Sequence, residues 1–185
     1  MEIKRIHITG ASGSGTTTLG RSLSAYLGYQ HIDSDDYFWL PTDPPFQTVR
    51  PLEERKKLLD NALSRENSWV SSGSLCGWGD FAIPRFDLVI FLYLPQKERI
   101  KRLIKREQER SPESFIEGSV RFRQFNEFIE WAKKYDTGGL EVRSQKLHTD
   151  WLQKLSVPVM KIEGTLSKRD TLNLVLLYLF KKKGG

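Results

Sequence analysis

A chain of 185 residues with 38% apolar and 11% aromatic residues is long enough to bury one sizeable core and short for two domains. Its 29 basic and 23 acidic residues give a net charge of +6, but they are interleaved, which argues against nucleic acid as the main partner. A single cysteine, Cys76, excludes an internal disulfide and fits a reducing cytosol. No apolar run approaches the roughly 20 residues of a membrane span. We therefore expect one cytoplasmic domain over residues 1–185, without a membrane contact, as a monomer or a homodimer.

Strands and helices are expected to alternate along the chain. The run DLVIFLYLP at 87–95 is apolar throughout, as expected for a strand covered on both faces of a parallel sheet. Residues 34–46, SDDYFWLPTDPPF, contain too many prolines and turn formers for regular structure. This alternation indicates an α/β domain with a parallel sheet. The expected strands cover 3–10, 29–33, 68–73, 87–95 and 157–164, and the expected helices cover 16–27, 52–65, 97–110, 119–135, 141–155 and 168–180.

A glycine-rich segment, GASGSGTTTLG at 10–20, joins the first strand to the first helix. Gly10 and Gly15 have the G-x-x-x-x-G spacing of a phosphate-binding loop, and Thr17 occupies the position of its Ser/Thr. Backbone N–H groups at the helix N-terminus would bind phosphate, and the Thr17 hydroxyl would join a magnesium shell. The residues predicted to bind the nucleotide are Gly10, Ser12, Gly13, Ser14, Gly15, Thr16, Thr17 and Thr18.

Thr16 stands where such a loop usually has its lysine. The lysine supplies a full charge that bridges the β- and γ-phosphates, so a nucleotide could bind here while phosphoryl transfer suffers. Two alternatives stay open on this ground. The segment could be a glycine turn that merely joins strand to helix, or the chain could be a nucleotide-binding regulatory protein or weak NTPase without kinase activity.

The segment GSGTTTLGRSLSAYLG at 13–28 resembles the cytidylate kinases of the archaeal type, whose loop also has threonine in place of lysine. In the order of its elements, nearly the whole chain resembles the adenylate-kinase-like group of P-loop small-molecule kinases. Sequences of this kind are often labelled AAA family ATPases, although no second module of a ring-forming machine is visible here. The resemblance implies a three-layer P-loop NTPase fold, a parallel five-stranded sheet of order 2-3-1-4-5 and a helical lid near 107–125. It also implies ATP and Mg2+ as cofactors.

The stretch LPQKERIKRLIKREQER at 94–110 places Arg99, Arg102 and Arg106 on one helix face. In adenylate kinases a similar stretch leads into the lid and supplies arginines to the transferring phosphates, so the resemblance implies this role for Arg102 and Arg106. Arg121 and Arg123 would form a second pair. The structural alternative is a solvated helix whose glutamates pair with these arginines.

Carboxylates follow the second strand in HIDSDDYFW. Asp33 and Asp35 have the D-x-D spacing seen in shikimate- and gluconate-kinase-like proteins, where such groups orient or deprotonate the acceptor hydroxyl and hold magnesium. We therefore predict Asp33 and Asp35 as catalytic residues, and Asp33 with Thr17 as magnesium ligands. The alternative is that the aspartates cap a turn, a role to which we assign Asp36.

Aromatic residues cluster where loops follow strands, at Tyr37, Phe38, Trp39 and Trp78. They fit either a flat, partly apolar substrate such as a base, or the packing of a long loop over the core. The predicted reaction is ATP-dependent phosphoryl transfer to a small-molecule acceptor, with a nucleoside or nucleotide favoured over a sugar or a shikimate-like acid.

The segment SSGSLCGWGD at 71–80 replaces the Asp-Gly-Phe-Pro-Arg pattern that nucleoside-monophosphate kinases carry after the third strand. No obvious arginine pair remains to bind an acceptor phosphate. Arg50, Arg55 and Arg85 are the remaining candidates, and the sequence does not choose among them.

Overall fold

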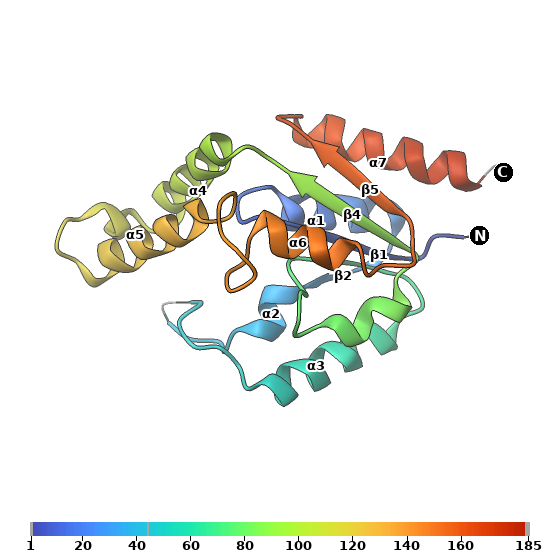
Figure 1. The fold of residues 1–185 in the computed structure, drawn as a ribbon, viewed down its shortest axis with the longest axis horizontal. Helices are drawn as coiled ribbons and strands as arrows, with labels where there is room; N and C mark the ends of the chain where they lie inside the picture. The colour runs from blue at the N-terminus through green and yellow to red at the C-terminus, as the bar shows by residue number, and fades with distance from the viewer. Residues whose placement is uncertain (1, 44, 184–185) are drawn as a thin grey trace.

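A five-stranded parallel sheet forms the centre of the computed structural model, which describes residues 2–43 and 45–183 (Figure 1). The strand order is β2-β3-β1-β4-β5, with every neighbouring pair parallel. This confirms the predicted α/β class, the five strands and their order. The strands are β1 (Arg5–Gly10), β2 (Gln30–Asp33), β3 (Trp69–Ser72), β4 (Leu88–Tyr93) and β5 (Val159–Glu163).

The helices follow the expected alternation with one correction. Ser34–Phe38, expected to be irregular, forms a short helix, α2. Asp33 caps it by accepting a hydrogen bond from the N–H of Asp35 at 3.2 Å. The acidic residues in its first turn stabilise it further, because their negative charge lies at the positive end of the helix. The other α-helices are α1 (Thr16–Leu27), α3 (Leu52–Arg65), α4 (Gln96–Arg110), α5 (Val120–Lys133), α6 (Gln145–Leu152) and α7 (Lys168–Lys183), and the 3-10 helices are η1 (Asp80–Arg85) and η2 (Pro112–Phe115).

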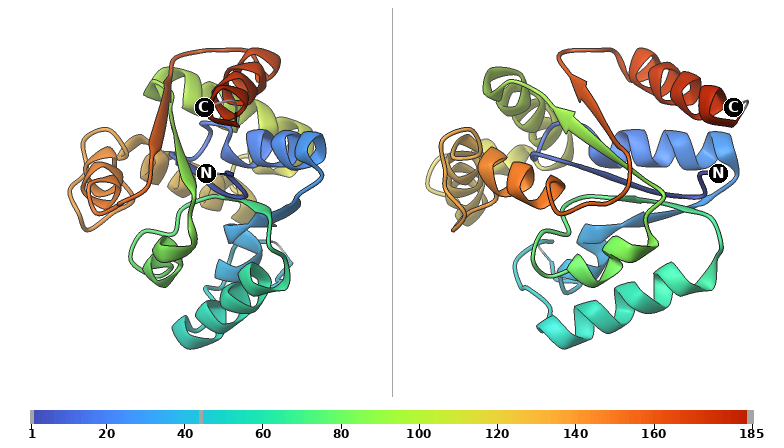
Figure 2. Two further views of the ribbon diagram at one scale, coloured as in Figure 1. Left: turned by 90° about the vertical axis from the view of Figure 1, so that its right-hand side faces the viewer. Right: turned by 45° about the vertical axis from the view of Figure 1, so that its right-hand side comes forward.

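Both faces of the sheet are covered, and β4 shows how the sequence achieves this. Its residues alternate between the two faces, because successive strand side chains point in opposite directions. Leu88, Ile90 and Leu92 pack in a core with α1 and α7, and Val89 and Phe91 pack in a second core with α3, η1 and α6. These helices form the two outer layers in Figure 2.

The carboxyl ends of the strands meet at one edge of the sheet. The register places Gly10 beside Leu92 and Asp33 beside Ser72. At this edge α4, η2 and α5 project from the sheet as an arm (residues 96–133), toward which β4 and β5 point in Figure 1. Open α/β sheets bind ligands at such an edge, so the fold brings the predicted nucleotide and acceptor residues to one side of the molecule.

The arm has a small apolar core of its own. Leu103 from α4 packs there with Ile129 and Ala132 from α5.

Across residues 2–43 and 45–183, no helix has the length and apolar character needed to cross a membrane.

Candidate functional site

The segment between β1 and α1 forms a tight loop of backbone. The N–H of Ser14 donates to the Ala11 carbonyl at 3.0 Å. Gly13 and Gly15 have φ of +83° and +103°, the left-handed region that glycine enters without steric cost. Helix α1 then begins at Thr16 with no side-chain cap and no acidic residue in its first turn. Its first N–H groups and the positive helix end are therefore available to an anion.

Close packing explains two of the loop glycines. A Cβ at Gly10 would lie 2.5 Å from the Leu92 carbonyl oxygen, and one at Gly13 would lie 2.8 Å from the Arg99 carbonyl oxygen. The loop is thus pressed against β4 and α4. Ser14 Oγ is buried without a hydrogen-bond partner among the described residues, which is rare for a buried hydroxyl unless a ligand or water completes it.

The remaining predicted nucleotide residues surround this loop. Ser12, Thr16 and Thr17 are half-buried, and Thr18 is exposed on the first turn of α1. Thr16 and Thr17 open the helix whose N-terminus faces the loop, so the threonine that replaces lysine lies at the site and is not packed away in the core.

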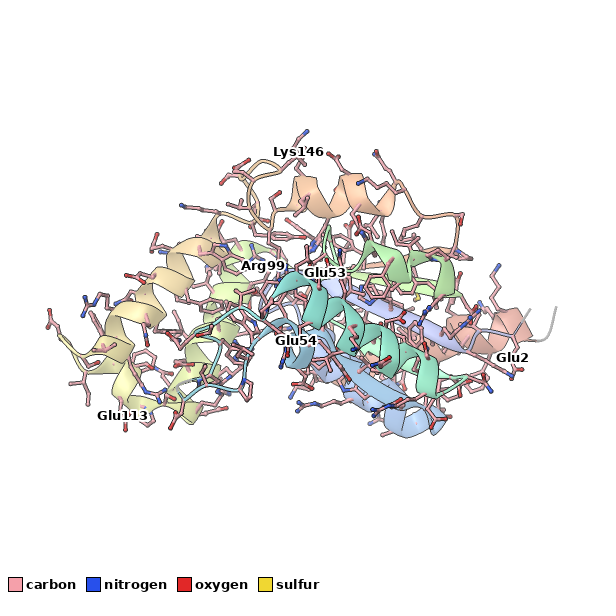
Figure 3. All side chains as sticks on the ribbon, turned by 90° about the horizontal axis from the view of Figure 1, so that it is seen from below. Glu2, Glu53, Glu54, Arg99, Glu113 and Lys146 are labelled. Atoms are coloured by element: carbon pink, nitrogen blue, oxygen red, sulfur yellow. The ribbon has the colours of Figure 1, made fainter. Side chains whose placement is uncertain are left out.

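The three arginines of α4 that were predicted to share a helix face, Arg99, Arg102 and Arg106, do not share one environment. Arg99 is fully buried: its Nε donates to the Leu94 carbonyl at 3.0 Å and its Nη1 to the Ala132 carbonyl at 3.2 Å. Its Nη2 forms an ion pair with Asp136, and the guanidinium lies over the Tyr135 ring. Figure 3 shows Arg99 near the centre of the molecule and Glu113 at the far tip of the arm. Arg99 therefore anchors the arm to the sheet.

Arg102 lies beside the predicted phosphate loop. A Cβ built at Gly15 would be 3.9 Å from Arg102 Nη1. The side chain is exposed and makes no hydrogen bond or ion pair with any residue that the structure describes. A free guanidinium thus stands next to the loop that lacks its lysine.

Arg106, one turn further along α4, lies close enough to Asp35 for their charges to interact. Partial burial lowers the pKa of Arg106, as does Arg110, while Glu107 and Asp35 act in the opposite direction. Glu107 itself accepts a hydrogen bond from Ser114 at 2.7 Å and is not in an ion pair with Arg106 among the described contacts. Both side chains are exposed and neither has an ion pair with a glutamate of this helix among the described residues. The face is therefore solvated but not internally paired, and the roles of Arg102 and Arg106 at the phosphates stay predictions.

The second predicted pair is not brought together. Arg121 forms ion pairs with Asp43 at 3.7 Å and Glu113 at 3.4 Å. Arg123 is exposed and lines a groove along α5 together with Trp131. The roles of Arg121 and Arg123 at the phosphates stay predictions.

The arm touches the loop between α2 and α3. Gln124 donates to Gln47 at 2.7 Å, and Arg110 lies over the Phe46 ring at 5.8 Å. Together with the Arg121–Asp43 pair, these contacts join the arm to the segment that follows the acceptor carboxylates, as the adjacent ribbons in Figure 3 show.

The aspartates after β2 have different surroundings: Asp33 caps α2, and Asp35 lies among charged groups. One oxygen of Asp33 caps α2, as the structural alternative expects. Asp35 is half-buried; burial raises the pKa of Asp35, as do Asp33 and Asp36, whereas Arg143 and Arg106 lower it. Asp35 is thus a carboxylate held between like and opposite charges, as acid–base groups often are.

Sequence reasoning missed Arg143. It lies between α5 and α6, above the Trp131 ring at 5.5 Å, and its charge acts on both Asp35 and Cys76. A lone arginine in an irregular segment carries no local signal, and its position becomes visible only once the fold returns this loop to the acceptor side. Burial raises the pKa of Cys76 to about 11, so this cysteine stays a thiol at neutral pH.

The aromatic residues are largely structural. Trp78 is 8% exposed and belongs to the core covered by α3 and α6, against which Tyr37 and Phe38 also pack. Trp78 Nε1 donates to the Ser74 carbonyl at 3.0 Å. Of the two alternatives for this cluster, packing under a loop describes Trp78.

Comparison with known proteins places this site among P-loop proteins. A family described as "AAA domain" matches residues 6–120. The chain is 46% identical over 176 residues to "Uncharacterized protein YqaC" of Bacillus subtilis (strain 168), covering 95% of this chain and 97% of that protein. It is 32% identical over 129 residues to a cytidylate kinase of Thermococcus kodakarensis, covering 64% of this chain and 65% of the kinase. A shikimate kinase of Clostridium botulinum is 25% identical over 120 residues, covering 60% and 71%.

Solved structures show the same fold. A shikimate kinase from Acinetobacter baumannii in complex with shikimate has a TM-score of 0.57 at 18% identity, covering 98% of this chain and 95% of that one. A deoxyadenosine kinase from M. mycoides with bound dCTP has a TM-score of 0.51 at 16% identity, covering 96% and 99%. At these identities the likeness is one of fold, and it confirms the resemblance to P-loop small-molecule kinases in architecture.

Proposed function

The chain belongs to the AAA domain family of P-loop proteins and is distantly related to cytidylate and shikimate kinases, and we propose that it is an ATP- and Mg2+-dependent kinase acting on a small-molecule acceptor. One observation carries the proposal: the free guanidinium of Arg102 lies beside Gly15, in the loop where Thr16 replaces the usual lysine. Because this loop lacks its lysine, phosphoryl transfer needs a positive charge from elsewhere in the chain, and Arg102 would supply it.

The residues present fit a nucleoside triphosphate. The glycines at 10 and 13 have no room for a side chain, the first turn of α1 has no acidic residue, and Ser14 Oγ has no hydrogen-bond partner within residues 2–43 and 45–183. The backbone N–H groups of residues 12–17 would hold the phosphates. Thr17 and Asp33 would hold Mg2+, which keeps several waters and takes its other oxygens from substrate phosphates. When bound, Mg2+ neutralises charge on the transferring group.

The acceptor hydroxyl reacts beside Asp35. The oxygen of the acceptor hydroxyl forms a bond to the γ-phosphorus of ATP. The bond from that phosphorus to the β–γ bridging oxygen breaks, and ADP leaves. Asp35 accepts the hydroxyl proton, which a carboxylate with a raised pKa does more readily than an ordinary aspartate. Arg102 and Arg106 stabilise the charge that spreads over the transferring oxygens.

We propose the segment 107–125 as the lid of a single P-loop kinase-like domain over residues 1–185. Arg121 and Arg123 would approach the phosphates only if this segment moves from its present contacts with Asp43 and Glu113. When lids of this kind close, they exclude water and bring the last catalytic residues into place. The similarity to cytidylate kinases supports a nucleoside or nucleotide acceptor.

A nucleotide-binding regulatory protein or weak NTPase is the second candidate, because Thr16 removes the loop charge used in transfer. Single-turnover transfer of labelled γ-phosphate from ATP, with Mg2+, to nucleosides, nucleotides and hydroxy acids separates the two. The kinase proposal predicts transfer to one class of acceptor. Tight ATP binding with transfer to none of them would contradict it and favour the regulatory protein.

A further inference from the structure

Helix α5 has a packed face and an outer face. The packed face contributes Phe125, Ile129 and Ala132 to the small core that α5 shares with α4. The outer face carries a groove of about 470 Å³ along the helix between residues 122 and 134. Figure 1 shows α5 at the end of the molecule opposite both chain termini. The groove, called the α5 groove below, therefore lies on a part of the molecule that a large partner can reach.

Two rows of side chains border the α5 groove. The rows consist of Phe122, Asn126 and Glu130, and of Arg123, Glu127 and Trp131. Residues four apart are neighbours on a helix surface, and such rows form the ridges that pack into the groove of a second helix. The shape of the α5 groove thus suits another helix.

Most charges of the α5 groove are unpaired. Arg123, Glu127 and Lys134 are exposed, and their side chains make no ion pair or hydrogen bond with any residue in 2–43 and 45–183. Glu130 pairs with its neighbour Lys133 at 2.6 Å in a solvent-exposed contact, which is weak and easily exchanged. The two acidic residues lie between the two basic ends of the groove. Electrostatic complementarity therefore favours a partner that carries both signs of charge over nucleic acid or an acidic peptide.

We propose that the α5 groove is the contact surface between two copies of this chain, with their α5 helices antiparallel about a twofold axis that passes beside Asn126 and Glu127. Arg123 and Glu130 lie equally far from this axis on either side, and seven residues are close to two full turns, so both side chains face the same way. Each Arg123 then comes opposite Glu130 of the second copy, and the pair forms twice, as a twofold interface requires. Parallel helices would place each of these charges against its like.

Trp131 gives the proposed interface an apolar anchor. The side chain is half-buried and lines the α5 groove. Its ring stacks with Phe128 at 5.9 Å and lies under the Arg143 guanidinium at 5.5 Å, and rigidly held tryptophans often dominate the affinity of protein interfaces. Helix α5 has 14 residues, so it is only about 21 Å long. The contact is therefore small, and the pair should form and separate reversibly.

The proposed pair gives Arg123 a use at the surface of the arm. While two copies are associated, Arg123 is held by the glutamate of the second copy. Its predicted approach to the phosphates would then require the pair to separate. The inference itself does not depend on the kinase proposal, because association is measured without a nucleotide or an acceptor.

Sedimentation equilibrium of the full chain tests the association. We expect a monomer–dimer equilibrium with a dissociation constant of about 1–100 μM, in keeping with a small interface. A chain that stays monomeric up to about 1 mM, some tenfold above that range, would overturn the inference.

Exchange of charges locates the contact. Glu130→Arg should weaken the association at least about tenfold, because it places an arginine opposite Arg123 of the second copy. Arg123→Glu should have the same effect by opposing two glutamates. The double variant Arg123→Glu, Glu130→Arg exchanges the two charges and should associate to within about threefold of the wild type. Glu117→Arg changes an exposed glutamate of the arm outside the α5 groove, and this control should leave the association unchanged.

Two results with these variants would overturn the inference. Wild-type association of both single variants would place the contact on another face of the molecule. A double variant that associates as poorly as the single variants would show that Arg123 and Glu130 do not meet. All the changed side chains are exposed, so thermal unfolding of every variant should match the wild type, and the losses then report association alone.

Discussion

The phosphate loop and the acceptor side are built in different ways. Residues 10–18 form one continuous turn whose shape is set by its own glycines and by the start of α1. The predicted acceptor side gathers Asp35, Arg106 and Arg143 from three separate parts of the chain. A continuous motif can be recognised from spacing alone, whereas a dispersed site depends on how the fold returns distant loops to one edge.

Helix α4 carries residues of both regions, and its arginines show what residue spacing alone cannot predict. Arg99 and Arg102 are three residues apart, but Arg99 is fully buried and paired with Asp136, 37 residues later. Arg102 is exposed beside Gly15. Helical periodicity predicts that they share a face and does not reveal which one anchors the arm and which one is free to act on a ligand.

The largest expected effect comes from the cation beside the loop. Arg102→Ala should reduce kcat by about 10³- to 10⁵-fold, the range known for arginines that stabilise a transferring phosphoryl group. ATP affinity should fall much less, because the backbone N–H groups remain. Steady-state kinetics and ATP binding measure the two quantities, with Lys101→Ala, which removes an exposed cation of the same helix, as the control. Equal loss in both, or loss in neither, would show that Arg102 has another role.

On the acceptor side the largest effect is expected at the proposed base. Asp35→Asn should lower kcat by about 10²- to 10⁴-fold, the usual contribution of a positioned general base. Asp36→Asn, which changes the exposed neighbour, should have little effect. The comparison fails if both variants lose activity to the same extent, since that would indicate a general effect of charge on α2.

A stability measurement separates the anchor from the ligand arginine. Arg99→Met should lower the free energy of unfolding by about 3 kcal/mol, because it breaks a buried pair and leaves Asp136 without its partner. Arg102→Ala should change it by less than about 0.5 kcal/mol, as expected for an exposed side chain. Urea unfolding of both variants checks this. An Arg99→Met variant as stable as the wild type would mean that the arm is held by its apolar contacts alone.

The smallest expected effect is on the pH profile. Burial raises the pKa of Asp35, and a base must be ionised to act, so kcat/KM should fall on acidification at a higher pH than for an ordinary aspartate. Arg143 favours the ionised form of Asp35. Arg143→Gln should therefore move this acidic limb to still higher pH. A limb that stays in place, or moves to lower pH, would show that Arg143 does not act on the base.

The sequence predicted the parts that depend on local pattern. Alternating and continuous apolar runs indicated all five strands and their order followed from the family resemblance. Helix α2 was missed because prolines further along the same segment masked the cap formed by Asp33. The position of Arg143 could not be predicted, since it depends on contacts between segments that are distant in the chain.

The central claim is that Arg102 supplies the charge absent from the loop at Thr16. Single-turnover phosphoryl transfer by Arg102→Ala and by the double variant Thr16→Lys, Arg102→Ala tests it most directly. Thr16→Lys alone should leave ATP binding intact or tighter. The double variant should transfer phosphate at least about tenfold faster than Arg102→Ala, a recovery well within the range attributed to one such cation. Wild-type transfer by Arg102→Ala, or no recovery in a double variant that still binds ATP, would contradict the claim.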